Sequence, residues 1–149
     1  MAVSSGVFPC YENQFKVDVS NTDTPSWKTV ADCETFEVSF DNGVEEWTPF
    51  ESEGWTRRLM TAKSVTITVS GKRNVGDDGN DFISGLSFAN GQSAQAGFQW
   101  VLPNGSTTTT VTFDNAVINV TNNLGGDATN VAPLEFEVMS NGKPTVTTA

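Results

Sequence analysis

Histidine is absent from all 149 residues of this sequence. It is the usual general base near neutral pH and the commonest metal ligand, so its absence excludes Ser-His and Cys-His nucleophile arrangements and most enzyme classes. The remaining enzymatic option is a glycosidase that uses paired carboxylates, such as Glu135 with Glu137 or Glu45 with Glu46. Because alternating glutamates on a strand usually face solvent, we expect no enzyme, no catalytic residue and no cofactor.

Basic residues are scarce. The chain has 8 Lys and Arg against 18 Asp and Glu, a net charge of −10. Sequence-reading contact with nucleic acid needs clustered Lys and Arg to neutralise phosphates, and this charge balance argues against it. We therefore expect no sequence-specific binding of DNA, which a protein of this charge would repel.

Cysteines and long apolar runs are also few. Cys10 and Cys33 are too few and too oddly spaced for a disulfide scaffold or a CxxC redox motif, so we expect two free thiols. No run approaches the roughly 18 apolar residues that span a bilayer. The first residues lack the basic and apolar regions of a signal peptide, so we expect a protein in solution, without a membrane partner.

What the sequence does contain is alternation of apolar and polar residues, the period of half-buried antiparallel strands. We predict a mainly β fold of seven or eight strands: an antiparallel β-sandwich or a partly closed barrel, as a single domain over residues 1–149. The N-terminal segment 1–21 holds a possible first strand. The alternating stretches are 15–19, 36–40, 64–70, 98–102, 107–113, 116–120 and 134–138, the last of which we take as the final strand.

One segment breaks the alternation and predicts a short flanking helix. Asp77, Asp78, Asn80 and Asp81 offer N-cap side chains and early acidic charge ahead of apolar residues at helical spacing, so we expect a helix over Asn80–Ala89. The same cluster resembles a calcium loop. However, counting from Asp77, the third position is glycine and the sixth is phenylalanine, which does not fit an EF-hand. We expect capping and no metal.

The stretch 41–59 is acidic, rich in turn residues and carries Trp47, Phe50 and Trp55, so we expect a long protruding loop or hairpin. Exposed aromatic residues there suit a sugar-binding surface or a protein interface. An equally weighted alternative is that the tryptophans tuck beneath their own loop. Basic residues gather just after it, which suits contact between a basic edge and an acidic surface of another copy; they are Arg57, Arg58, Lys63, Lys72 and Arg73.

Four short motifs resemble those of bacteriophage major tail proteins, the tail tube family. These are Gly54–Leu59 (GWTRRL), Ala62–Arg73 (AKSVTITVSGKR), Gly76–Asp81 (GDDGND) and Phe136–Pro144 (FEVMSNGKP). The resemblance covers about Trp27 to Pro144 and leaves Met1–Asn21 outside. It implies a β-sandwich or barrel with a flanking helix. It also implies a virion protein that is made in the host cytoplasm. It also implies hexameric rings that stack into a hollow tube through which DNA leaves, with the tape measure, terminator and distal tail proteins as partners.

The resemblance and the composition together suggest roles for individual residues. Inter-subunit contacts are expected from the 41–59 segment, through Trp47, Phe50, Trp55, Arg57 and Arg58. Lumen-facing positions are expected on the polar faces of the strands, at Glu37, Ser39, Thr66, Thr68, Glu135 and Glu137. Unpaired strand edges are expected to pair between subunits of a closed ring. The alternatives are a carbohydrate-binding β-sandwich module and another tail component, such as a terminator or an adhesion domain.

Overall fold

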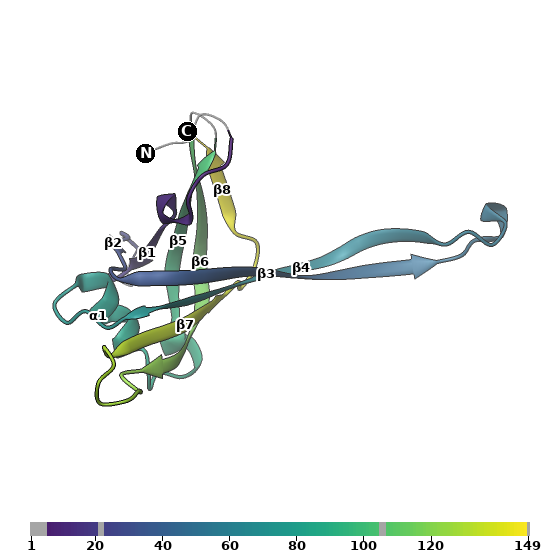
Figure 1. Cartoon of the computed structure of the whole chain (residues 1–149). Coiled ribbons are helices and arrows are strands. Elements are labelled where there is room, and N and C mark those ends of the chain that lie inside the picture. Colours follow the sequence, from purple (N-terminus) through teal and green to yellow (C-terminus); the bar gives the residue numbers. More distant parts are fainter. Residues whose placement is uncertain (1–5, 21–22, 105–106, 149) are drawn as a thin grey trace.

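The computed structural model describes residues 6–20, 23–104 and 107–148. In these residues the chain forms one antiparallel sheet of eight strands with a single α-helix (Figure 1). The strands are β1 (Gln14–Asp18), β2 (Trp27–Thr29), β3 (Cys33–Trp47), β4 (Arg57–Lys72), β5 (Gln95–Asn104), β6 (Thr107–Asn123), β7 (Pro133–Met139) and β8 (Thr145–Thr148). The helix is α1 (Asp78–Gly85), and three 3₁₀ turns are η1 (Cys10–Glu12), η2 (Phe50–Ser52) and η3 (Gly91–Ala94).

The predicted fold class is confirmed, because the chain is mainly β with one short helix and one long protruding hairpin. The strand order is β2-β1-β5-β6-β7-β4-β3, with β8 paired to β6. The sheet curls without closing: β1 and β3 lie toward opposite ends of that order, yet the rings of Phe15 and Phe36 meet with their centroids 5.0 Å apart. One continuous curled sheet corresponds to the partly closed barrel that we considered. No helix within the described residues is long and apolar enough to cross a membrane.

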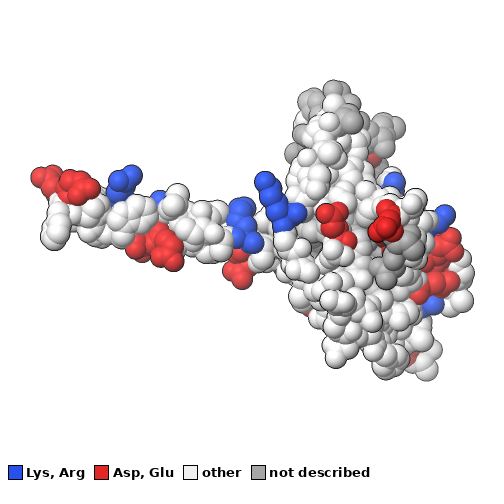
Figure 2. All heavy atoms as spheres, turned by 180° about the vertical axis from the view of Figure 1, so that it is seen from behind, with Lys and Arg blue, Asp and Glu red and all other residues white. Residues whose placement is uncertain are grey.

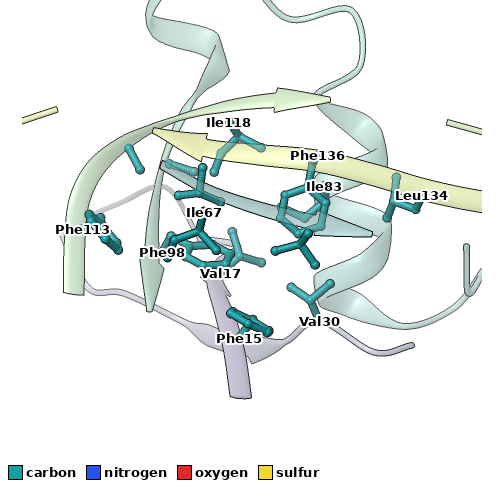
Figure 3. Packing of buried hydrophobic residues seen from close by; sticks show 14 residues of the cluster. Phe15, Val17, Val30, Ile67, Ile83, Phe98, Phe113, Ile118, Leu134 and Phe136 are labelled. Atoms are coloured by element: carbon teal, nitrogen blue, oxygen red, sulfur yellow. The ribbon is translucent and has the colours of Figure 1, made fainter. Parts of the chain in front are cut away.

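The concave side of the curled sheet holds the hydrophobic core (Figure 3). Val17, Ile67, Val69 and Phe98 are fully buried there, and Ile83 of α1 adds a fully buried side chain. Full burial of one such side chain contributes about 1.5–3 kcal/mol. The β-branched residues of β4 alternate inward along one strand, which is why that strand follows its predicted pattern so closely.

Three predicted elements differ from the structure. Stretches 107–113 and 116–120 belong to one strand, β6, which continues through a bulge: Ala96 pairs with Ala116 and Phe98 with Phe113, so one residue faces two. The predicted helix Asn80–Ala89 is wrong in its limits, because α1 spans Asp78–Gly85 and is followed by hydrogen-bonded turns up to Ala89. A further strand, β8, follows the one expected to be the last.

The predicted first strand of the 1–21 segment is β1, which ends at Asp18. Residues 1–5 and 21 of that segment lie outside the described part of the chain. Residues 105 and 106, which connect β5 to β6, lie outside it too, although the two strands pair up to Asn104 and Thr107.

Candidate assembly surface

The most conspicuous feature outside the core is a two-stranded hairpin that leaves the body of the molecule (Figure 1). It is formed by the outer halves of β3 and β4, and we call residues 41–64 the arm. Within the arm these two strands pair only with each other among the described residues, because the pairing of β4 with β7 begins at Thr66. An isolated two-stranded hairpin is at best marginally stable in water. The arm therefore lacks the packing that would stabilise it in a single chain.

The tip of the arm is closed by a hydrogen-bonded turn. Pro49 precedes the 3₁₀ turn η2, and the hydroxyl of Ser52 donates to the carbonyl oxygens of Pro49 at 2.9 Å and of Trp55 at 2.7 Å. Glu53 and Gly54 follow with φ of 54° and 89°, the left-handed region that reverses the chain. The tip is thus held by hydrogen bonds of the Ser52 hydroxyl and by its backbone conformation, and its large side chains are free to contact another molecule.

The aromatic residues predicted as contact residues are exposed on the arm. Phe50 is 103% exposed, Trp55 is 80% exposed and Trp47 is 42% exposed. The alternative in which the tryptophans tuck beneath their own loop is therefore not what the structure shows. Other large apolar side chains on the arm are also exposed, namely Val44, Leu59 and Met60. Such a concentration of exposed apolar side chains is typical of a protein interface.

Both predicted contact arginines lie on the arm and face Trp47 and Glu46 of β3. Arg58 Nε donates to Glu46 Oε1 at 2.7 Å, and the guanidinium of Arg57 lies 5.7 Å from the centroid of the Trp47 ring. Both members of the ion pair are more than half exposed, so the pair contributes only about 0–1 kcal/mol. These charged groups remain accessible to a second molecule.

The predicted basic edge is not a single surface. Arg57, Arg58 and Lys63 lie on the arm, whereas Lys72 and Arg73 lie at the opposite end of β4. In the body Lys72 Nζ pairs with Glu34 Oε1 at 2.8 Å. Five basic residues that are close in sequence are separated because an extended strand advances about 3.3 Å per residue.

The six residues predicted to line a lumen lie on one face of three neighbouring strands. Glu37 pairs with Thr68, Thr68 pairs with Glu137, and directly opposed residues of antiparallel strands share a face. Ser39 likewise pairs with Thr66, and Glu135 lies two residues from Glu137 on β7. This is the face turned away from the core, and β6 extends it, since Asn119 Nδ2 donates to Glu137 Oε1 at 2.9 Å.

The four residues predicted to cap the helix have different roles in the structure. Asp77 is the N-cap and accepts from the backbone N–H groups of Asn80 at 3.0 Å and Ala31 at 3.1 Å. Asp78 is exposed in the first turn, and Asp81 pairs with Arg73 Nη1 at 2.8 Å. Asn80 is not a cap: it is 1% exposed and lies in the first turn of α1. No group of three or more acidic or cysteine side chains within the described ranges is arranged to hold a metal ion.

Both cysteines line a groove of about 360 Å³ at the seam between β1 and β3, and neither forms a disulfide. Burial, together with the nearby carboxylates of Asp32 and Asp77, raises the pKa of the Cys33 thiol to about 12. Cys10 is exposed. The groove was not predicted, because it arises where distant ends of the sheet curl together.

Comparison with known proteins places the fold. No protein-family model and no curated protein matches the chain. Among solved structures, a chain in the tail of an empty gene transfer agent particle with C6 symmetry matches with a TM-score of 0.71 and 19% identity, over 95% of this chain and 99% of that one. A chain of the anti-feeding prophage cap, described as a tube-terminating cap, matches with a TM-score of 0.66 and 18% identity, over 100% and 95%.

A third structure, the sheath/tube terminator of the extracellular contractile injection system PVC, matches with a TM-score of 0.59 and 17% identity, over 97% of this chain and 98% of that one. At sequence identities this low, the structural similarity establishes the fold alone. The matches cover nearly the whole of each chain, so the body and the arm are compared together. The chain thus has the fold found in structures of phage-like tails and tube terminators, as its resemblance to bacteriophage tail tube proteins implied.

Proposed function

We propose that this protein is a non-enzymatic structural subunit of a phage-like tail tube, which forms hexameric rings that stack into a hollow cylinder in the virion. The observation that carries the proposal is the arm: a hairpin without a core of its own, exposing Trp47, Phe50 and Trp55. In Figure 1 the arm leads away from the body, so its tip is remote from its own barrel. A contact between the tip of one copy and a different surface of the next is heterologous, and heterologous contacts generate rings or filaments.

The polar face of β3, β4 and β7 supports a second part of the proposal, that this face lines the lumen. It carries Glu37, Glu135 and Glu137, with hydroxyl groups between them. Carboxylates repel phosphate over a screening length of about 8–10 Å at physiological ionic strength. A wall of this composition would conduct DNA without holding it, and no sequence-specific contact is expected.

Electron microscopy of the purified protein tests the proposal. We expect rings or tubes of the unmodified protein at high concentration, and a clear loss of them in Trp55→Ala, because an exposed anchor of an interface is removed. Ser93→Ala, a truncation on the surface turn η3 far from the arm in sequence, is the matched control and should assemble normally. A protein that stays monomeric at every concentration, also with purified tails, would contradict the proposal.

A tube terminator is the second candidate, because two of the matching structures are described as a tube-terminating cap and a sheath/tube terminator. Both candidates use the same fold and predict ring formation. Copy number separates them: a tube subunit is present in many stacked rings of a particle, whereas a terminator is present in one. Quantitative mass spectrometry of purified particles measures this ratio directly.

A further inference from the structure

The charges on the arm are separated by strand. The β3 part of the arm, residues 41–47, carries Asp41, Glu45 and Glu46 and no basic residue, whereas its β4 part, residues 57–64, carries Arg57, Arg58 and Lys63 and no acidic residue. Figure 2 shows this as blue atoms along one edge of the arm and red atoms along the other, with further red atoms at the tip. The arm is therefore a ribbon with one acidic and one basic edge.

Both edges of this ribbon are open to a further strand. Within the described residues β3 pairs only with β4 along its whole length, and β4 has no second partner in the arm. Open edges are normally protected by proline, a short strand, a covering element, a bulge or charged side chains, and the charges of the arm repel a like edge but attract one of opposite sign. The arm strands contain no proline within Cys33–Trp47 or Arg57–Lys72. Their backbone N–H and C=O groups are thus available for pairing with another chain.

From these observations we propose that arms of neighbouring copies pair edge to edge, with the basic β4 edge of one arm beside the acidic β3 edge of the next. This deepens the proposed function and rests on it, because it names the surface through which the arm joins subunits of one ring. We assign a second copy of this chain as the partner of each edge. The two edges carry complementary charges, and a two-stranded hairpin gains stability from a third strand.

The strand directions suit this arrangement. When two arms point the same way, β3 of one runs toward its tip and β4 of the other runs back toward its body, so the new pair is antiparallel like the pair inside each arm. In each arm Glu46 lies opposite Arg58. Arms side by side at the same height place each Arg58 between two carboxylates, its own Glu46 and that of the neighbour.

The bulge in the arm limits where pairing is regular. Gly43 pairs with Ala62 and Val44 with Met60, so Thr61 has no opposite residue. A bulge bends its strand and interrupts the ladder. The outer segments, 44–47 and 57–60, therefore form the regular pairing surface, and they contain the ion pair that the proposal uses.

Two single charge reversals, Glu46→Arg and Arg58→Glu, distinguish the effect of charge between neighbouring arms from its effect within one arm. The first variant carries two positive charges at this position and the second carries two negative charges, so the internal pair is repulsive in both. We expect each variant alone to need about tenfold more protein to form rings, because like charges then face each other between neighbours as well. In a one-to-one mixture, positive and negative arms alternate, and we expect ring formation to return toward that of the unmodified protein.

Sedimentation velocity and electron microscopy measure ring formation, and circular dichroism checks that both variants keep the folded body. Glu34→Lys and Lys72→Glu reverse the exposed ion pair of the body and are the matched control, for which mixing should change nothing. Single variants that assemble as well as the unmodified protein, or a mixture that assembles no better than its components, would overturn arm-to-arm pairing. Failure of the unmodified protein to assemble would instead contradict the proposed function itself.

Discussion

Replacement of Asn80 by alanine is expected to destabilise the fold severely although it removes only a small side chain. Asn80 Nδ2 donates to the carbonyl oxygens of Ala31 at 3.1 Å and of Lys72 at 2.9 Å. Its Oδ1 accepts from the backbone N–H of Asn74 at 3.0 Å and from Arg73 Nη1 at 2.8 Å. This one amide therefore joins the first turn of α1 to the β2–β3 turn and to the end of β4.

The size of this loss in stability follows from the polar groups that lose Asn80 as a hydrogen-bond partner. Asn80→Ala leaves three backbone groups without this partner, while the Arg73 guanidinium keeps its contact with Asp81 at 2.8 Å. A buried polar group without a partner costs about 1–3 kcal/mol, and alanine returns at most about 0.7 kcal/mol through helix propensity. We expect a loss of about 3 kcal/mol in the free energy of unfolding, or a Tm lower by about 6–12 °C for a chain of this size.

Urea denaturation and differential scanning calorimetry of the monomeric protein measure this loss. Asp78→Ala, in the same helical turn but exposed, is the control and should change the free energy of unfolding by about 0.5 kcal/mol or less. A loss below about 1 kcal/mol for Asn80→Ala would refute the reasoning, because it would mean that water or a small rearrangement replaces the buried amide.

Three further predictions concern single residues. At pH 8 a thiol reagent should label Cys10 rapidly and Cys33 only after unfolding, because a pKa of about 12 leaves about one Cys33 thiolate per 10⁴ thiols; equal native labelling rates would contradict this. Hydrogen bonds from Arg73 and the Gly76 amide lower the pKa of Asp81 below its ordinary 3.8. The stability that these bonds give is therefore present above pH 3.8 and is lost as the pH falls through the lower pKa of the folded state. NMR titration of Arg73→Ala should show the pKa of Asp81 rising again. In Gly79→Ala the new Cβ would lie 2.5 Å from a β2 carbonyl oxygen, and the free energy of unfolding, measured in urea, should fall by about 1–2 kcal/mol despite the better helix propensity.

The sequence predicts those parts of the fold in which a residue's neighbours along the chain determine its surroundings. In β4, Ile67 and Val69 alternate with threonines and point into the core as expected, and the polar face follows from the same alternation. In the arm neither face meets a core, so the alternation disappears and the sequence indicates only a loop or hairpin. The bulge that joins 107–113 to 116–120 is likewise invisible locally, because it is defined by the opposite strand.

The candidate site follows the same rule. Exposed aromatic residues in the arm were predictable from their position among turn residues. The role of Asn80 was not, because its sequence context is that of a helix cap and its partner Ala31 lies 49 positions away. The basic residues form one cluster in the sequence but lie toward the two ends of β4, a separation that sequence distance alone does not show.

The continuity of β3 and β4 from the core to the tip has a mechanical consequence. Each strand passes from barrel to arm without an intervening loop, although the ladder of the arm is interrupted at the bulge beside Thr61. Movement of the tip is then resisted by the hydrogen-bonded ladder that also holds the core. Bending of the arm is therefore expected to concentrate at this bulge, while the part nearer the body stays rigid with the barrel that it extends.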